Sequence, residues 1–409
     1  MPAYLDLLKN WMAVNSFTAN REGVLIHTQQ LTEAFTRLGF RVADQETAAT
    51  AQSVHLGLIG GAADTLAPTV GLITHLDTVF TVEEETLANF RWTVEGDRVY
   101  GPGANDIKGG TAMIWLVLST LQEFYPEVFH STRWVLLANA AEERLAPDFH
   151  PFCVSHLGPA TRACLVFEAG ADVNSSSEFP LVVARKGRSE WCVHVEGRAA
   201  HAGADIASGA NAVVQAAHLI PRLAALADPA RELSVNIASL RGGALTNCVP
   251  AHARIVGESR AFAPAVLEQM AADMRRLCAS VGTDVPVVRS QADGLACRAT
   301  FEVSMNTQTW SENINTDALW GVWKSAATDL GMKVSREHRG GLSDGNRLSA
   351  VYPTLDGLGP AGGNSHCSER SADGSKLPEY LVISSIAPKA LLNIEALVRL
   401  LTAPARAIS

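Results

Sequence analysis

The sequence predicts an α/β fold whose mostly parallel sheet has helices on both faces. The first observation is that short apolar runs alternate with stretches of helical spacing over the first part of the 409 residues. Apolar runs of this kind are typical of strands that are buried on both faces. The second is that the pattern changes near Arg185 and returns after residue 308, which indicates an insertion. We therefore expect one domain from residues 1–185 and 309–409, and another from residues 186–308.

The elements of the larger domain are expected in a simple order. An amphipathic helix begins the chain, and a second helix spans residues 21–38. Strand-like runs and helical stretches then alternate, at 69–77, 109–124, 131–140 and 160–170. Helical spacing resumes after the insertion, at 315–331 and 383–401. Strands that alternate with helices favour a parallel sheet, because each helix carries the chain back across the sheet.

The inserted segment has a different pattern. In residues 189–197, the apolar side chains of Trp191, Val193 and Val195 fall on one face, as in a strand with one buried side. A helix, two strand-like runs and another helix follow, at 211–226, 232–240, 252–262 and 264–282. This β-α-β-β-α pattern predicts an α+β domain of the ferredoxin-like kind.

Composition excludes several classes of protein. Apolar residues make up 47% and charged residues 18%, which is ordinary for a globular chain and unlike a disordered one. The net charge of −9 gives no basic surface for nucleic acid or an anionic membrane. Seven cysteines without a CxxC pair predict neither a disulfide framework nor a thiolate zinc site. No run approaches the roughly 18 apolar residues of a membrane span, and no export signal is recognised, so we expect a cytoplasmic protein.

Ligand-type residues follow the strand-like runs. In an open α/β sheet, ligands bind at the carboxyl ends of strands, so polar residues at those positions are candidates for a site. These residues are His75, Asp77, Asp106, Glu142, Glu143, Glu168 and, in a Gly-rich segment, His366. Each alone has an ordinary explanation, since Asp106 could cap a helix and the two adjacent glutamates could be a surface pair. Several strand ends that each offer a metal ligand together predict a metal site.

The donors suit a pair of divalent cations. Two imidazoles and three carboxylates supply nitrogen and oxygen without sulfur, which fits zinc and also cobalt or manganese, with one carboxylate bridging both ions. Asp77 lies two residues after His75, on the same side of an extended chain, and can orient its imidazole. Of Glu142 and Glu143, one can bind metal while the other acts as a base. Two such ions activate water and polarise a carbonyl, which is the chemistry of amide hydrolysis.

The motifs resemble those of a known family. Six strings occur in the family order over most of the chain: HLDTVF, GPGANDIKGG, AAEER, VFEAG, GRAAHAG and GNSHCSER. The chain resembles the co-catalytic zinc metallopeptidases that include glutamate carboxypeptidase, aminoacylase, acetylornithine deacetylase and succinyl-diaminopimelate desuccinylase. The glutamate carboxypeptidase branch is the most similar in pattern. The resemblance implies two Zn²⁺ ions, with Co²⁺ or Mn²⁺ as alternatives.

The resemblance also implies a role for each residue of the metal site. Asp106 bridges the two ions. The other ligands are His75 and Glu168 for one metal, and Glu143 and His366 for the other. Glu142 becomes the general base, and Asp77 orients the first histidine.

In the inserted domain, the resemblance implies a lid that also forms the dimer. His201 matches a histidine that reaches into the partner subunit's active site and helps to hold the oxyanion. Asn247 and Arg260 match positions that bind the free carboxylate of the substrate, a task that suits the planar fork of arginine. Gly341 matches a Gly-rich loop that lines the pocket. From the residues alone, His201 would be a turn residue and Arg260 an exposed strand residue.

We therefore predict a homodimeric di-zinc amidohydrolase. Its substrate is an N-acyl amino acid or short peptide, from which it releases an amino acid with a free α-carboxylate. The alternatives within the family are a biosynthetic deacetylase or desuccinylase, and a dipeptidase. A catalytically silent metal-binding protein is a further alternative, but we would expect such a protein to lack the base or a ligand, and Glu142 is present.

Overall fold

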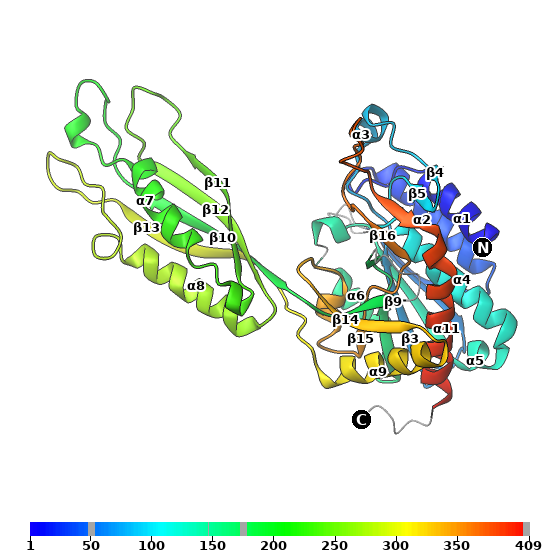
Figure 1. The fold of residues 1–409 in the computed structure, drawn as a ribbon. Helices are drawn as coiled ribbons and strands as arrows, with labels where there is room; N and C mark the ends of the chain where they lie inside the picture. The colour runs from blue at the N-terminus through cyan, green and yellow to red at the C-terminus, as the bar shows by residue number, and fades with distance from the viewer. Residues whose placement is uncertain (48–53, 146, 172–177, 404–409) are drawn as a thin grey trace. The chain divides into compact units, whose positions relative to one another are not determined.

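The structure, a computed structural model, describes residues 1–47, 54–145, 147–171 and 178–403 (Figure 1). The chain divides into two compact units. Unit 1 comprises Met1–Val183, Glu312–His338 and Ser343–Ser409, and unit 2 comprises Ala184–Ser311 and Arg339–Leu342.

Unit 1 is built on a six-stranded sheet in the order β1-β2-β6-β3-β7-β15. The strands are β1 (Arg41–Thr47), β2 (Val54–Gly61), β3 (Thr69–His75), β6 (Arg133–Asn139), β7 (Thr161–Val166) and β15 (Thr354–Leu355). β6, β3, β7 and β15 run parallel to their neighbours, whereas β1 pairs with β2, and β2 with β6, in antiparallel fashion. The predicted α/β fold class is confirmed, and β1 and β2 add an antiparallel edge that we did not predict.

Helices cover both faces of this sheet, as predicted. One core contains residues of α1 (Pro2–Met12), α2 (Arg21–Thr36), α4 (Lys108–Phe124), α9 (Ile314–Asp329) and α11 (Ile386–Thr402). A second core contains residues of α6 (Phe149–His156) and α10 (Gly345–Leu348). In β6, Leu136 and Ala138 belong to the first core, and Val135 and Leu137 belong to the second. The strand is apolar throughout because successive side chains point to opposite, equally buried faces.

A second sheet of unit 1 supports the C-terminal Gly-rich segment. Its strand order is β4-β5-β17-β16-β8. The strands are β4 (Thr93–Glu95), β5 (Arg98–Tyr100), β8 (Gly170–Ala171), β16 (Ala361–Gly363) and β17 (Tyr380–Val382). Because β8 pairs with β16, the chain just after Glu168 lies beside the chain just before His366. The remaining helices of unit 1 include α3 (Val82–Leu87) and α5 (Pro126–Ser131).

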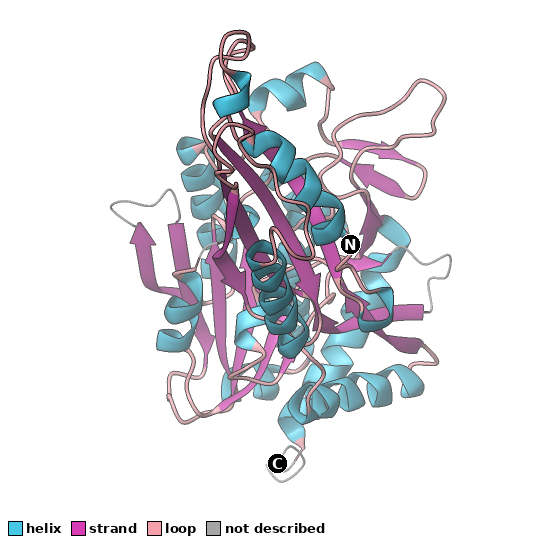
Figure 2. Cartoon of the chain, turned by 90° about the vertical axis from the view of Figure 1, so that its left-hand side faces the viewer, coloured by secondary structure: helices cyan, strands magenta, loops and turns pink. Residues whose placement is uncertain are grey.

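Unit 2 is an α+β unit with an antiparallel sheet in the order β11-β12-β10-β13 (Figure 1). Its elements are β10 (Gly187–Glu196), α7 (Ala212–Ala224), β11 (Ser234–Gly242), β12 (His252–Ala261), α8 (Pro264–Ala279) and β13 (Arg298–Thr307). The final strand, β13, completes the ferredoxin-like order and was not predicted. The two helices pack together on one face of the sheet (Figure 2), over Trp191, Val193 and Ile255.

A short Gly-rich segment, Arg339–Leu342, belongs to unit 2 although it follows α9 in the chain. The Lys186 N–H donates to the Arg339 carbonyl (3.0 Å), and Arg185 Nη1 donates to the Gly341 carbonyl (3.1 Å). The strands that lead to these contacts, β9 (Glu178–Arg185) and β14 (Lys333–Arg339), pair as a two-stranded sheet. The pairing of β9 with β14 joins segments far apart in the chain and cannot be read from the spacing of apolar residues. The sequence therefore predicts this segment in the larger domain, whereas the structure groups it with unit 2.

Two further features bear on the chemistry of the chain. All seven cysteines lie among the described residues and are free thiols. In the ranges that the structure describes, no helix is both long enough and apolar enough to cross a membrane.

Candidate metal centre

The architecture of unit 1 brings the predicted metal ligands together. His75 ends β3, Glu143 lies in the turn after β6, and Glu168 follows β7 by two residues. β6, β3 and β7 are parallel neighbours, so their carboxyl ends meet at one edge of the sheet. Asp106 precedes α4, and His366 lies in the loop between β16 and β17.

Asp106 lies between the two histidines. Its Oδ1 is 3.0 Å from His75 Nε2, and its Oδ2 is 3.3 Å from His366 Nε2. Each histidine also faces a second carboxylate: Glu168 Oε1 is 3.8 Å from His75 Nε2, and Glu143 Oε2 is 3.2 Å from His366 Nε2. The five side chains therefore form two groups of donor atoms that share one carboxylate.

Asp77 links the first histidine to the turn after β6. Its Oδ1 is 3.3 Å from His75 Nδ1 and accepts the N–H of Glu142 (3.3 Å). Its Oδ2 accepts a hydrogen bond from the hydroxyl of Thr18 (2.7 Å), a residue that we did not predict to take part. These contacts hold the imidazole so that Nε2 faces Asp106.

Carboxylates outnumber basic groups in this cluster. Burial raises the pKa of Glu142 well above its ordinary range, and the nearby charges of Asp344 and Glu168 raise it further. Burial also raises the pKa of Asp344 to about 7, although Asn139 donates a hydrogen bond to it (2.6 Å). The acidic members are Asp77, Asp106, Glu142, Glu143, Glu168 and Asp344, against the two histidines. This excess of negative charge favours the binding of cations.

The excess of carboxylates also raises the pKa values of the two histidines. Burial lowers the pKa of His75, but hydrogen bonds with Asp106 and Asp77 outweigh this effect and raise it. Hydrogen bonds with Asp106 and Glu143 raise the pKa of His366 to about 11. For Asp106, burial raises the pKa, but the hydrogen bonds with His366 and His75 outweigh it, so the pKa is lowered. A proton held between imidazole and carboxylate satisfies the same lone pairs as a metal cation, and the two compete.

The residues present fit divalent cations. Ligand atoms of His75, Asp106 and Glu143 all lie within 4.8 Å of one another. Glu143 Oε1 is buried and has no hydrogen-bond partner within the described part of the chain. Leaving a buried carboxylate oxygen unpaired is costly, so this atom is suited to a ligand. Nitrogen and oxygen donors without sulfur match Zn²⁺, Co²⁺ and Mn²⁺.

A buried carboxylate that we did not predict supports both ligand loops. Glu379 Oε1 accepts the N–H groups of Asn105 (3.0 Å) and Asp106 (3.2 Å), and its Oε2 accepts the N–H of His366 (3.3 Å). Burial raises the pKa of Glu379 to about 8. The signal in the sequence is weak, since it is only one charged residue immediately before a buried strand.

His201, predicted to be catalytic, and Asn247, predicted to bind substrate, lie on neighbouring segments of unit 2. The Ala202 N–H donates to the Asn247 carbonyl (2.9 Å), which joins the segment of Asn247 to that of His201. His201 is exposed, and its Nδ1 accepts the N–H groups of Gly203 (3.1 Å) and Ala204 (2.9 Å). Because Nδ1 is an acceptor, the neutral ring carries its hydrogen on Nε2, which is then available as a donor.

Arg260 and Gly341, also predicted to bind substrate, lie at the Gly-rich segment of unit 2. Arg260 Nε and Nη2 donate to the two carboxylate oxygens of Glu258 (2.8 and 3.4 Å), and Nη1 donates to the Gly340 carbonyl (3.1 Å). The Gly341 carbonyl accepts from Arg185, a buried residue. The guanidinium of Arg260 is therefore already paired with a carboxylate, so a substrate carboxylate must compete with Glu258 for it.

Comparisons with known proteins agree on fold and family. Residues 71–384 match the profile of Peptidase family M20/M25/M40. Carboxypeptidase G2 from Pseudomonas sp. (strain RS-16) is 28% identical over 259 residues, which make up 63% of this chain but only 60% of that protein. A tripeptidase from Staphylococcus aureus has a TM-score of 0.74 at 21% identity, covering 98% of both chains. A dinuclear metal-binding M20 peptidase from Bacillus subtilis has a TM-score of 0.65 at 14% identity, covering 97% of this chain and 98% of that one.

We expect the substitution Glu379→Gln to weaken metal binding by about 10- to 100-fold, the usual cost of losing a group that supports a ligand. An amide has one oxygen, so its NH₂ group would face a backbone N–H of Asp106 or His366 and leave a buried donor unpaired. The measurement is calorimetric titration of the metal-depleted variant with Zn²⁺.

The matched control is Glu369→Gln, which removes an exposed carboxylate from the same loop. This variant should bind Zn²⁺ with the affinity of the unaltered protein. If Glu379→Gln also bound with unaltered affinity, Glu379 would have no supporting role.

Proposed function

Because this chain belongs to Peptidase family M20/M25/M40, we propose that it is a di-metal hydrolase that releases a C-terminal amino acid from an N-acyl amino acid or short peptide. The observation that carries the proposal is the position of Asp106. Its two carboxylate oxygens face different histidines, and each histidine faces a further carboxylate. Two ligand groups around one shared carboxylate are what a pair of cations requires.

Five residues are proposed to hold the cations. They are Asp106 as the shared ligand, His75 and Glu168 in one group, and Glu143 and His366 in the other. When bound, two divalent cations lower the pKa of a water molecule and polarise the scissile carbonyl. Zn²⁺ suits this donor set, and Co²⁺ and Mn²⁺ are the alternatives.

Glu142 is proposed as the general base. It directly precedes Glu143, and the contact between its N–H and Asp77 fixes the turn on which it lies. In the proposed mechanism, its carboxylate takes a proton from the attacking water and passes it to the leaving nitrogen. Asp77 orients the imidazole of His75 through Nδ1.

Residues of unit 2 are proposed to act on the substrate. The Nε2–H of His201 donates to the carbonyl oxygen as negative charge develops on it. Asn247 and Arg260 are proposed to bind the free α-carboxylate of the leaving amino acid, and Gly341 to line the pocket. Arg260 donates to the carbonyl of Gly340, the residue before Gly341. In this role the substrate carboxylate would replace Glu258 at the guanidinium of Arg260, whose planar fork suits two-point contacts with carboxylates.

We further propose that unit 2 serves as a lid and dimerisation domain, so that the protein is a homodimer in which His201 completes the site of the partner subunit. The exposure of His201 is consistent with this role.

Other activities of the family remain alternatives. The sequence similarity to carboxypeptidase G2 favours the release of a C-terminal amino acid, whereas the fold similarity to a tripeptidase fits a peptidase of short peptides equally well. A biosynthetic deacetylase or desuccinylase is a third possibility. A catalytically silent metal-binding protein is disfavoured because Glu142 is present, partly buried, and directly precedes Glu143.

Amide hydrolysis should depend on metal and on a free α-carboxylate. We would incubate chelator-treated protein, with and without added Zn²⁺ or Co²⁺, with N-acyl amino acids, dipeptides and the matching α-amides, and detect the products by mass spectrometry. We expect cleavage of the free acids only, and only with metal. Equal cleavage of the α-amides would contradict the carboxylate-binding role, and no cleavage of any substrate by metal-loaded protein would contradict the proposed hydrolase.

The substitution Glu142→Gln should lower kcat by about 100- to 10,000-fold, because an amide of the same shape cannot accept the proton. Both metals should remain bound, as measured by elemental mass spectrometry, since Glu142 is not a proposed ligand. The control is Glu123→Gln, an exposed residue of α4, which should leave kcat unchanged. Near-normal turnover of Glu142→Gln would show that another group is the base.

A mixture of subunits should test the proposed action of His201 across the dimer. Protein with His201→Ala and protein with Glu142→Ala should each be inactive, and activity should return when the two are mixed. Recovery is expected because a mixed dimer contains one site with both residues intact. If subunits exchange, as shown by mass tags, and activity does not return, His201 acts within its own subunit or has no role.

A further inference from the structure

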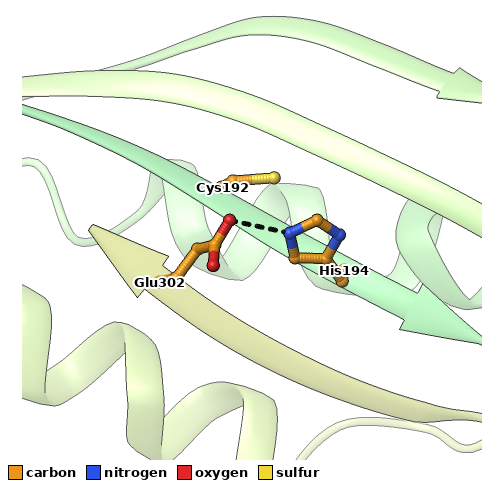
Figure 3. A group of neighbouring side chains, drawn as sticks. All are labelled: Cys192, His194 and Glu302. Atoms are coloured by element: carbon orange, nitrogen blue, oxygen red, sulfur yellow. Dashed lines mark hydrogen bonds and ion pairs between the residues drawn. The ribbon is translucent and has the colours of Figure 1, made fainter. Parts of the chain in front are cut away.

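One face of the unit 2 sheet carries a mixed group of metal-ligand side chains (Figure 3). Cys192 and His194 lie two residues apart on β10, so they point to the same face of the sheet. Glu302 lies on β13, directly opposite Cys192 in the antiparallel register. The residues between them, such as Val193, point to the other face and are buried in the core that contains α7 and α8. The group therefore lies on the face that these helices leave uncovered.

The donor atoms of this group are close together. A sulfur, a ring nitrogen and a carboxylate oxygen lie within 4.8 Å of one another. His194 Nε2 is 2.9 Å from Glu302 Oε1 (Figure 3), and these side chains are 44% and 59% exposed. An open pocket of about 660 Å³ is lined by His194 and Arg254, so solvent reaches the group from the side of His194.

We propose that Cys192, His194 and Glu302 bind a divalent cation in unit 2, at a site separate from the candidate metal centre of unit 1. One thiolate, one imidazole and one carboxylate fill three positions of a tetrahedral zinc site, and a water molecule takes the fourth. The sulfur donor selects Zn²⁺ or Co²⁺ over Mg²⁺, which prefers oxygen. Binding releases the thiol proton to solvent. The proposal does not depend on the proposed hydrolase activity.

The placement of Cys192 distinguishes this group from an ordinary surface ion pair. An exposed pair such as His194 and Glu302 is common and contributes little to stability. Cys192, however, is 1% exposed and lies on the face of β10 that also carries His194 and Glu190, away from the apolar core. Across the sheet, Cys192 lies opposite Val256 on β12 and Glu302 on β13, and its sulfur accepts from Arg254, so charged groups lie beside the sulfur on this face.

Arg254 competes with a cation for this sulfur. It lies on β12 opposite His194, and its Nε donates to Cys192 Sγ at 2.9 Å. The guanidinium charge beside the sulfur opposes the approach of a divalent cation. Arg254 is exposed, so its side chain can rotate into solvent without uncovering the core. Arg254 therefore lowers the affinity of the proposed site for a divalent cation.

Cobalt tests the proposal because a thiolate ligand produces a sulfur-to-cobalt charge-transfer absorption, which sites with only nitrogen and oxygen donors lack. We would titrate the metal-depleted full chain with Co²⁺. The expected result is a charge-transfer band in the near ultraviolet and one more bound ion per chain than in Cys192→Ser, which should lose the band. His194→Gln and Glu302→Gln replace exposed residues and should weaken the binding followed by this band by at least about tenfold.

The matched control is Cys367→Ser, because Cys367 is a partly exposed thiol next to His366. The band should persist in this variant. If it disappeared there and persisted in Cys192→Ser, the sulfur ligand would belong to unit 1 and the proposal would be wrong. The absence of a band in the unaltered protein, with far-ultraviolet circular dichroism showing it folded, would also overturn the proposal.

The substitution Arg254→Gln tests whether Arg254 competes with the cation for Cys192 or helps to hold the site together. Removal of the positive charge should tighten the binding followed by the band by roughly tenfold. An unchanged or weaker affinity would refute the competing role of Arg254, and loss of the band would show that the guanidinium is needed to assemble the site.

Discussion

The position of Asp106 between two imidazoles is the constraint on which unit 1 depends. One oxygen faces His75 at 3.0 Å and the other faces His366 at 3.3 Å. A carboxylate can serve both histidines only if the end of a central strand, the start of α4 and a loop of the second sheet meet within a few ångströms. Asp77 contacts His75. Glu379 joins the loop of Asp106 to the loop of His366 by accepting a backbone N–H from each. The arrangement of the proposed ligands therefore depends on backbone contacts as much as on the ligand side chains themselves.

The same arrangement concentrates negative charge in a buried place. Burial and mutual repulsion raise the pKa values of Glu142 and Asp344, which means that the folded chain resists holding all of its carboxylates ionised. Cations that bind the folded state but not the unfolded chain offset this cost, and they stabilise the fold by mass action. At the proposed metal site, the excess of carboxylates would thus couple folding of unit 1 to metal binding.

Unit 2 divides its chemistry between the two faces of one sheet. Trp191, Val193 and Ile255 bury one face in the core with α7 and α8. On β10, β12 and β13, the alternate residues put charged and polar groups on the other face, including Arg260 with Glu258 and the group of Cys192, His194 and Glu302. Period-two alternation makes this division unavoidable, because each residue added to the core places its neighbour on the open face. The open face is therefore available for binding without loss of the core.

The sequence by itself determined the secondary structure around the site and the types of donor atom. Continuous apolar runs mark β3, β6 and β7 because both faces of these strands are buried, and ligand-type residues directly after the runs had to meet at one edge of a parallel sheet. It did not reveal β13, the antiparallel edge of β1 and β2, or the association of Arg339–Leu342 with unit 2. Local spacing records which face of an element is buried, but not which distant strand it pairs with.

Only the tertiary structure decided how the donor atoms are grouped and what supports them. Glu379 accepts the N–H of Asn105 from 274 positions along the chain, and Thr18 reaches Asp77 from 59 positions away. Neither contact follows from a motif, because any buried carboxylate or hydroxyl could make it. Hydrogen bonds and charge interactions change over fractions of an ångström, and such distances exist only after the chain has folded.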